Sequence, residues 1–139
     1  MAHKRICFII AAFSDGGVNR VVANLSNEFV KRGMEVTVVA LSSKYSETRS
    51  LYNDEVKLEC LNFFRVFSFL PLFWFFLKNR QYDVVISSVE FVNVHTIVAH
   101  TFAGLHSKLI VSTHTDLTAE KKQNTSLILK IVYRLSSIL

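Results

Sequence analysis

Two adjacent glycines, Gly16 and Gly17, are the first residues of this sequence that could do chemistry. They follow an apolar, β-prone stretch, CFIIAAF, and a short polar turn, and they open a helical pattern. Glycine has no Cβ, so a ligand can approach its backbone N–H group closely, and a helix start adds further donors and the positive end of the helix dipole. The pattern predicts a phosphate site. A tight turn without a ligand remains open, because the spacing is neither GxGxxG nor a Walker loop.

A second group of candidates follows two later apolar runs. His114 comes directly after residues 108–113, where an imidazole can donate to a phosphate or sugar hydroxyl or polarise a leaving group. Glu90 and Asp116 could act as a base or bind hydroxyl groups. The alternatives are a histidine satisfied by loop carbonyls and carboxylates that cap helices or occupy their first turns.

The other histidines and the cysteines predict no further chemistry. The five histidines do not form a metal site, because His95 and His100 face different sides of a helix and His3 lies at the terminus. We therefore expect no metal and no cofactor. Cys7 and Cys60 fall in apolar stretches, which predicts two free thiols and a reducing compartment.

Five β-prone runs alternate with helical patterns and must position these residues. The strands are expected in the run before residue 14 and in residues 35–41, 56–61, 82–88 and 108–113. Helices are expected after the glycine pair, within residues 62–80, at 90–104 and near the C-terminus. The alternation predicts an α/β fold, a Rossmann-like parallel sheet of order 3-2-1-4-5 with helices on both faces. The first helix should bury one apolar stripe, made of Val18, Val21, Val22, Leu25 and Phe29.

This strand order brings three polar clusters to one edge of the sheet. They are residues 14–20, 87–90 and 114–116, each at the carboxyl end of a predicted strand. Ligands of such sheets bind in the crevice at that edge, where the strand order reverses. The convergence of three distant segments therefore predicts a single ligand site.

Residues 62–80 form an unusually aromatic segment that contains Phe73, Trp74 and Phe76. It is too short and too interrupted to span a membrane, and Pro71 should open or kink a helix. One interpretation is a crossover helix packed on the sheet. The other is that one side of the helix, with these three aromatic residues, meets lipid or the apolar tail of an acceptor.

The overall composition narrows the class of protein. A chain of 139 residues that is 50% hydrophobic and contains a single proline can form one domain, 1–139, with a real core. The formal charge of +5 favours anionic partners such as phosphates or acidic lipid. No basic run with interleaved aromatic residues predicts nucleic-acid binding. Lys4 and Arg5 before an apolar run are typical of a signal peptide, but the run is short and leads into a helix, so we interpret it as a buried strand.

Three segments of the sequence resemble one known family. KRICFIIAAFSDGGVNRVVANLSNEFVKRGMEVTVVAL resembles the N-terminal opening of bacterial family-4 glycosyltransferases, which have the GT-B fold. YDVVISSVEFVN resembles the same family's fourth strand and its loop, and LIVSTHTDL resembles its strand that ends in histidine. The match extends over nearly the whole chain.

The resemblance implies a retaining enzyme that transfers a sugar from a nucleotide-sugar to a glycan or lipid-linked acceptor, in the cytoplasm at the inner face of the membrane. It implies that Gly16 and Gly17 approach the donor diphosphate and that His114 lies near the donor sugar. Because the N-terminal domain of this family mainly binds the acceptor, Asn19, Arg20, Glu90 and Asp116 become acceptor-binding candidates.

Two departures from the family pattern qualify this picture. Asn19 stands where many members carry glutamate, and the second, donor-binding domain with its two glutamates does not follow within this sequence. The chain is therefore expected to be the acceptor-side half, weakly active by itself, with a partner domain or self-association covering its interface. The alternatives are a binding or membrane-docking module without activity and a free-standing nucleotide binder. For the latter, Glu35 begins a strand, whereas a ribose-binding acid belongs at a strand's end.

Overall fold

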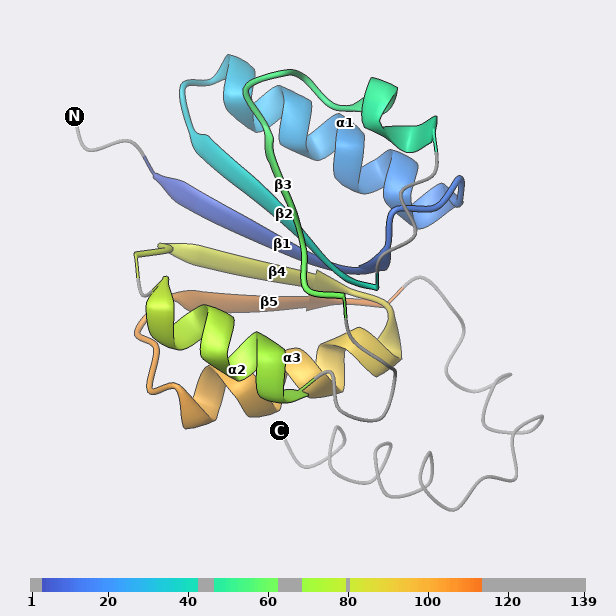
Figure 1. Ribbon diagram of the computed structural model, residues 1–139. Coiled ribbons are helices and arrows are strands. Elements are labelled where there is room, and N and C mark those ends of the chain that lie inside the picture. The colour runs from blue at the N-terminus through green and yellow to red at the C-terminus, as the bar shows by residue number, and fades with distance from the viewer. Residues whose placement is uncertain (1–3, 43–46, 63–68, 80, 114–139) are drawn as a thin grey trace, which may run out of the picture.

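The computed structural model describes residues 4–42, 47–62, 69–79 and 81–113. Its elements are β1 (Arg5–Ala12), α1 (Gly17–Lys31), β2 (Glu35–Ser42), the short 3-10 helix η1 (Glu47–Leu51), β3 (Lys57–Cys60), α2 (Phe69–Lys78), β4 (Val84–Ser88), α3 (Glu90–Phe102) and β5 (Lys108–Ser112). The strands form one parallel sheet in the order β3-β2-β1-β4-β5 (Figure 1). The predicted Rossmann-like fold and strand order are thus confirmed. The predicted C-terminal helix lies outside the described residues.

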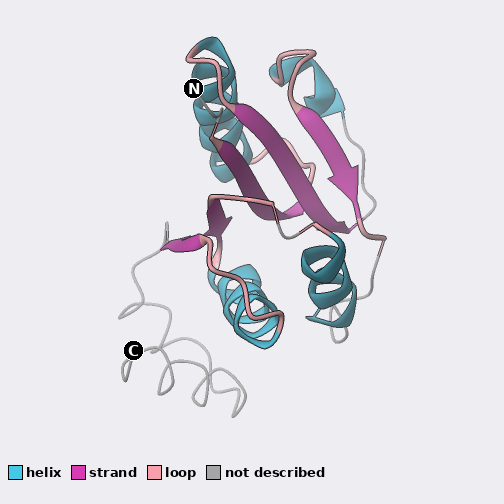
Figure 2. Ribbon diagram, turned by 90° about the vertical axis from the view of Figure 1, so that its left-hand side faces the viewer, coloured by secondary structure: helices cyan, strands magenta, loops and turns pink. Residues whose placement is uncertain are grey.

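The helices are divided between the two faces of the sheet. α1 lies on one face with η1 beside it, and α2 and α3 pack against each other on the other face (Figures 1 and 2). From β1 the chain crosses to β2, whereas from β4 it crosses to β5 in the opposite direction along the sheet. Right-handed crossovers therefore place α1 and α3 on opposite faces. The resulting crevice lies between the carboxyl ends of β1 and β4.

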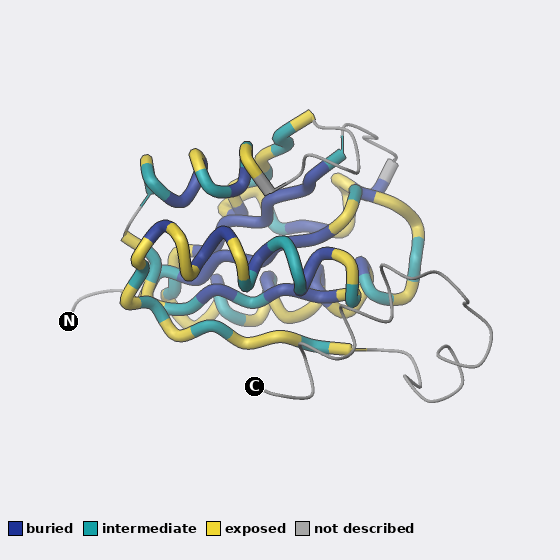
Figure 3. Tube along the Cα trace, turned by 90° about the horizontal axis from the view of Figure 1, so that it is seen from below, coloured by how far each residue is buried: buried dark blue, intermediate teal, exposed yellow. Residues whose placement is uncertain are grey.

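Two apolar clusters, one on each face, hold the helices to the sheet. Along β1, Phe8 and Ile10 belong to the cluster under α1, whereas Cys7 and Ile9 belong to the cluster under α2 and α3. All four side chains are at most 1% exposed. Burial on both faces explains why this strand is continuously apolar in sequence instead of alternating. Figure 3 shows these buried strands enclosed by helices whose outer sides are exposed.

The two cysteines are free thiols, as predicted. Cys7 is fully buried in the middle of β1, and this burial raises the pKa of its thiol well above the ordinary value. The thiolate, which is the reactive form, is therefore suppressed, and Cys7 acts as a small apolar core residue.

Helix α1 buries only part of the predicted stripe: Val22 is buried and Phe29 packs against the core, whereas two other members are exposed. Val21 and Leu25 of the predicted stripe are 43% and 42% exposed. The buried positions of the helix are Asn19, Val22, Ala23, Ser26 and Val30. Asn27 helps to fix this rotation, because its amide donates to the Leu51 carbonyl at 2.8 Å and ties one flank of α1 to η1. The opposite flank, with Val21 and Leu25, is left toward solvent.

The described part of the phenylalanine-rich segment is α2, with Pro71 in its first turn. Phe76 has no exposed surface and its ring makes a T-shaped contact with His100, with centroids 6.1 Å apart, so the prediction that Phe76 meets lipid or an acceptor tail is wrong. Phe73 is half-buried, and only Trp74 of the predicted three is well exposed, at 60%. Among the described residues, no helix has the length and apolar character that crossing a bilayer requires.

His100 makes stability depend on pH. The side chain is 8% exposed, its Nε2 lies 2.8 Å from the Ser107 hydroxyl, and burial lowers the pKa of the imidazole from its ordinary 6.5. The unfolded chain therefore takes up the proton at higher pH than the folded chain. We expect the free energy of unfolding to be highest above pH 6.5 and to fall as pH drops below it. In urea titrations, His100→Gln should make the unfolding free energy depend less on pH. His106→Gln, at an exposed site, should leave this pH dependence unchanged. Equal pH dependence in wild type and His100→Gln would contradict the assignment of the effect to His100.

Candidate functional site

A hollow of about 200 Å³ lies where the carboxyl ends of β1 and β4 meet the start of α1. Its lining comes from two segments far apart in sequence, namely Ile10, Ala11, Ala12, Ser14, Gly16, Gly17, Val18, Asn19, Ser88 and Val89. Two of the three polar clusters that the sequence predicted at this edge are therefore brought together. The third, with His114 and Asp116, lies outside the described residues.

The two glycines leave the start of α1 open on its ligand side. Gly16 is the N-cap residue and makes no side-chain cap, in an extended conformation with φ −100° that any residue can adopt. A Cβ added at Gly17 would meet no atom within 4 Å, and one at Gly16 would meet only the Ser14 hydroxyl, at 3.8 Å. Neither the backbone conformation nor the packing of the domain requires glycine here. The start of α1 is therefore open, and the predicted contact of these amides with a phosphate stays a prediction.

Asn19 holds the glycine loop in place. Its Nδ2 lies 2.9 Å from the Ala12 carbonyl, 2.6 Å from the Ser14 carbonyl and 2.8 Å from the Ser14 hydroxyl. The side chain is buried, at 6% exposure. The loop thus uses the amide donors of Asn19, which also lines the hollow, and its contact with an acceptor stays a prediction. These hydrogen bonds explain why an amide suits this position: a carboxylate could not donate to these oxygens.

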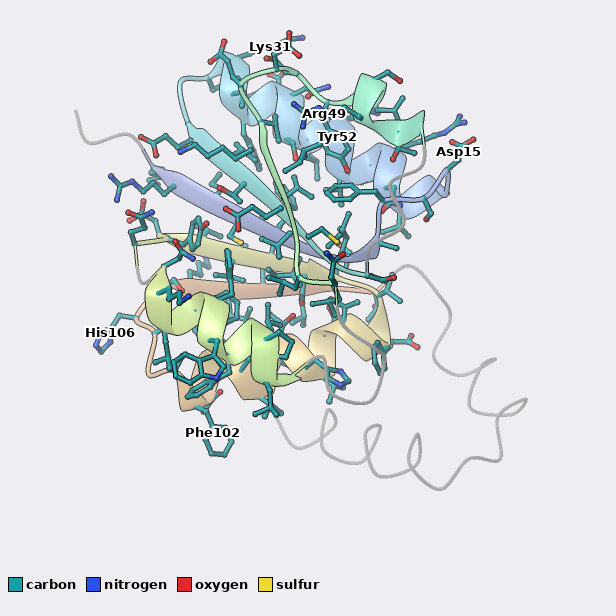
Figure 4. All side chains as sticks on the ribbon, in the orientation of Figure 1. Asp15, Lys31, Arg49, Tyr52, Phe102 and His106 are labelled. Atoms are coloured by element: carbon teal, nitrogen blue, oxygen red, sulfur yellow. The ribbon has the colours of Figure 1, made fainter. Side chains whose placement is uncertain are left out.

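Arg20 and Glu90, the other predicted acceptor residues that the structure describes, lie outside the lining of this hollow. Arg20 forms an exposed ion pair with Asp15 at 2.9 Å. Figure 4 shows Asp15 near the start of α1, beyond the carboxyl end of the sheet. Such exposed pairs contribute at most about 1 kcal/mol, and the predicted contact of Arg20 with an acceptor stays a prediction. Glu90 is half-buried in the first turn of α3. Its carboxylate suits the positive end of the helix dipole, which was its alternative interpretation.

A buried polar network behind the hollow was not predicted. The Ser87 hydroxyl donates to Asn93 Oδ1 at 2.6 Å, and Asn93 Nδ2 donates to the Ser112 carbonyl at 3.0 Å. Ser87 is fully buried and Asn93 is 5% exposed. The network joins the ends of β4 and β5 to the first turns of α3. No clear signal in the sequence pointed to it, because Asn93 became recognisable as buried only once α3 was placed on the sheet.

Val89 joins β4 to α3 in a strained conformation. Its φ of 84° with ψ of 132° lies in a region that β-branched residues avoid. Two backbone hydrogen bonds hold it there: its N–H donates to the Ser112 carbonyl at 3.2 Å, and its carbonyl accepts from the Asn93 N–H at 2.9 Å. Backbone strain of this kind concentrates at binding and catalytic sites, and Val89 lines the hollow.

Because of this strain, the glycine variant at position 89 should be more stable than the alanine variant, which is the reverse of the usual order. At ordinary positions Gly is less stable than Ala by about 0.5–1 kcal/mol. At Val89 both variants lose the same side chain, but only glycine removes the strain, so Val89→Gly should exceed Val89→Ala in unfolding free energy by roughly 1–2 kcal/mol. The matched pair Val98→Gly and Val98→Ala, at a 36% exposed site in α3, should show the ordinary order in urea titrations. If the alanine variant were the more stable one at both sites, Val89 would be unstrained.

Other parts of the described chain offer weaker sites. Hollows of about 160 and 250 Å³ lie near Arg5 and near His106, at the amino ends of the strands, whereas open parallel sheets bind ligands at the carboxyl ends. Figure 4 places His106 at the end of the molecule opposite Asp15. Within the described ranges, no three His, Cys, Asp or Glu side chains are grouped so that they could hold a metal ion. The expectation that the protein needs neither metal nor cofactor stays a prediction.

The fold and this edge define a Rossmann-like domain with an open glycine turn at the crevice between β1 and β4. Comparison with known proteins places it more narrowly. The model of Glycosyltransferase Family 4 matches residues 15–138. The chain is also 32% identical over 124 residues to the GalNAc-alpha-(1->4)-GalNAc-alpha-(1->3)-diNAcBac-PP-undecaprenol alpha-1,4-N-acetyl-D-galactosaminyltransferase of Campylobacter jejuni.

The chain belongs to glycosyltransferase family 4. The alignment with the Campylobacter enzyme covers 81% of this chain and 33% of the enzyme, so the chain spans about a third of that relative's length. The family match confirms the resemblance seen in the sequence.

Proposed function

We propose that this domain is the acceptor-side half of a glycosyltransferase that moves a sugar from a nucleotide-sugar donor to a lipid-linked glycan. The observation that carries the proposal is the hollow at the carboxyl ends of β1 and β4, into which the uncapped start of α1 opens through Gly16 and Gly17. Family membership makes a diphosphate the natural ligand for those amides. The free-standing nucleotide binder is less favoured because the family match extends along residues 15–138. The non-catalytic module is less favoured because the relative with 32% identity is named as a transferase.

The start of α1 and His114 have different roles in the proposed reaction. The N–H groups at the start of α1 would bind the donor diphosphate and stabilise the negative charge that develops as the nucleotide leaves. His114, two residues after the end of β5, would bind the donor sugar or polarise the leaving group. We propose retention of anomeric configuration, as in the family that the sequence resembles. We also propose that no metal is needed, since the start of α1 supplies positive charge.

The acceptor is proposed from the relative's name. The Campylobacter enzyme acts, by that name, on a glycan linked through diphosphate to undecaprenol. An acceptor with a polyprenyl tail remains at a membrane surface, so the enzyme must work close to that surface.

The outer side of the α2–α3 layer suits such contact. Five large apolar side chains of α2 and α3 are exposed, and we call them the outer apolar surface: Leu70, Trp74, Phe91, Val98 and Phe102. Those of α3 recur at helical spacing, as do the two of α2, so each helix presents one stripe. Phe102 is 72% exposed and projects away from the sheet (Figure 4). Lys78, exposed at the end of α2, would suit anionic headgroups.

The proposed activity is tested by sugar transfer in trans. The chain, mixed with a separately expressed C-terminal domain of a family member, should transfer sugar from a nucleotide-sugar to a polyprenyl-diphosphate glycan much faster than either part alone. His114→Ala should abolish the gain. A preference for NAD over nucleotide-sugars in binding titrations would favour the free-standing nucleotide binder instead.

Vesicle binding tests the outer apolar surface. We expect the double variant Trp74→Ser, Phe102→Ser to bind anionic phospholipid vesicles at least tenfold more weakly, because each side chain buries substantial apolar area in the interface. The matched control is Val21→Ser, Leu25→Ser, which removes exposed apolar side chains from the opposite face of the sheet. Equal vesicle binding by both double variants would contradict the assignment. If light scattering showed that the wild type is a dimer and that Trp74→Ser, Phe102→Ser is a monomer, a second copy of the chain would cover this surface.

A further inference from the structure

The hydroxyl group of Ser88 is buried and has no partner within the domain. Ser88 is the last residue of β4, is 3% exposed and forms part of the wall of the hollow between β1 and β4. No side chain or backbone group of the described residues is hydrogen-bonded to its Oγ. A buried hydroxyl without a partner costs free energy, so its presence in the wall of a hollow indicates that something polar binds there.

The alternation of side chains along β4 turns this hydroxyl toward the hollow. Ser87 points to the face covered by α3, where its hydroxyl donates to Asn93. Ile86 packs against the apolar cluster under α1, on the other face. Because successive side chains of a strand point to opposite faces, Ser88 lies on the same face as Ile86. The hollow opens on that face too, since Ile10 of the same cluster lines it.

The backbone on both sides of Ser88 is held in place. The preceding residue, Ser87, is anchored to Asn93 Oδ1 at 2.6 Å. The following residue, Val89, donates its N–H to the Ser112 carbonyl at 3.2 Å. Ser88 itself pairs with Ser112 across β4 and β5. The hydroxyl can therefore meet a ligand without prior ordering of the chain, and this preorganisation favours binding.

We propose that Ser88 is a ligand-binding residue whose hydroxyl donates to an oxygen of the diphosphate in the hollow. It would approach the ligand from β4, while the amides of Gly16 and Gly17 approach from the start of α1. The inference rests on the proposed function, which places a diphosphate there. The terminal oxygens of a diphosphate accept hydrogen bonds, and a serine hydroxyl can donate one. The donor that the domain leaves unused thus matches the ligand, in a bond strengthened by the negative charge.

The test compares two adjacent serines whose side chains point to opposite faces of β4. Ser88→Ala should weaken the binding of inorganic pyrophosphate about tenfold, the effect of losing one hydrogen bond to a charged group. NMR titration at the amides of Gly16 and Gly17 measures this affinity. The melting temperature should stay the same or rise, because no bond within the domain is lost. Ser87→Ala loses the bond to Asn93, so it should melt at a lower temperature and bind pyrophosphate as the wild type does.

Ser88→Cys is the second variant, which serves if the alanine variant folds poorly. It keeps the shape of the side chain, but a thiol is a weaker donor than a hydroxyl. It should therefore also weaken pyrophosphate binding, by less than Ser88→Ala. Wild-type affinity in both variants would show that the hydroxyl does not contact the ligand.

Two organic diphosphates distinguish the two sources of such a group. UDP carries it as a nucleotide-sugar does, and geranyl diphosphate carries it as a polyprenyl-linked glycan does. Stronger binding of UDP agrees with the proposed donor site, whereas stronger binding of geranyl diphosphate would contradict that part of the proposed function. In either case Ser88→Ala should weaken the preferred ligand about tenfold, because the contact is with the diphosphate itself.

Three results would overturn the inference. If Ser88→Ala binds pyrophosphate as tightly as the wild type while Gly16→Ala, Gly17→Ala binds it more weakly, the diphosphate site stands but Ser88 does not contact the ligand. If Ser87→Ala and Ser88→Ala weaken binding equally, the loss comes from the end of β4 as a whole. If the wild type binds no pyrophosphate, the proposed function fails and the contact with Ser88 fails with it.

Discussion

Phe76→Ala should lower the free energy of unfolding by roughly 3–5 kcal/mol, the range for truncating a fully buried aromatic side chain. Phe76 has no exposed surface, contacts the ring of His100 and fills the space between α2 and the sheet. A domain of this size has only about 5–15 kcal/mol of stability in total, so the loss is a large part of it. Urea or thermal unfolding followed by circular dichroism measures the change.

The contrast with the neighbouring aromatic residue makes this prediction specific. Trp74 lies two residues earlier in the same helix but is 60% exposed. Trp74→Ala should therefore change the unfolding free energy by less than about 1 kcal/mol, as for other surface positions. If both variants were equally unstable, α2 would be buried on all sides and the outer apolar surface would not exist. If both were stable, α2 would not pack on the sheet.

The parallel sheet could be predicted because its signal is local and repeated. Runs such as residues 36–41 are continuously apolar and β-branched, which is typical of strands buried on both faces, and helical patterns separate them. Right-handed crossovers then leave few possible topologies. The meeting of the glycine turn with Ser88 and Val89 follows from strand order alone, and the hollow they line matches it.

The rotation of α1 could not be predicted in the same way. Periodicity locates an apolar stripe but does not say which neighbour covers it. Here the hydrogen bonds of Asn19 to the loop and of Asn27 to η1 turn polar residues toward the sheet and leave Val21 and Leu25 exposed. Such bonds join residues that are far apart in sequence or hidden in loops, so they leave no periodic pattern.

The asparagine network escaped prediction for a related reason. Asn93 looks like a misplaced polar residue until β4 and β5 are beside it, because its partners are Ser87 and a carbonyl 19 residues away. The strain at Val89 is equally invisible, since valine normally predicts an extended strand. Both features lie at the edge where the sequence placed the site, which is where local rules are most often broken for function.

Substitution of the glycine pair should have the second large effect, a loss of ligand affinity without a loss of stability. Gly16→Ala, Gly17→Ala should bind inorganic pyrophosphate at least tenfold more weakly, because two methyl groups would stand between the anion and the N–H groups at the start of α1. Folding should not suffer. Both added Cβ atoms have room, neither position has positive φ, and alanine suits the first helical position better than glycine by about 0.5–1 kcal/mol. The domain should thus become slightly more stable while it loses its ligand.

Gly104 is the matched control, because glycine is needed there for its backbone conformation and not for access of a ligand. Its φ of 61° requires glycine at the end of α3, although a Cβ there would also meet no atom within 4 Å. Gly104→Ala should therefore lower the unfolding free energy by roughly 1 kcal/mol and leave pyrophosphate binding unchanged. In NMR titrations, only Gly16→Ala, Gly17→Ala should lose affinity for pyrophosphate. In urea unfolding, only Gly104→Ala should lose stability. Unchanged affinity in Gly16→Ala, Gly17→Ala would mean that the glycines serve only the turn from β1 into α1, and the diphosphate site would have to be sought elsewhere along the same edge.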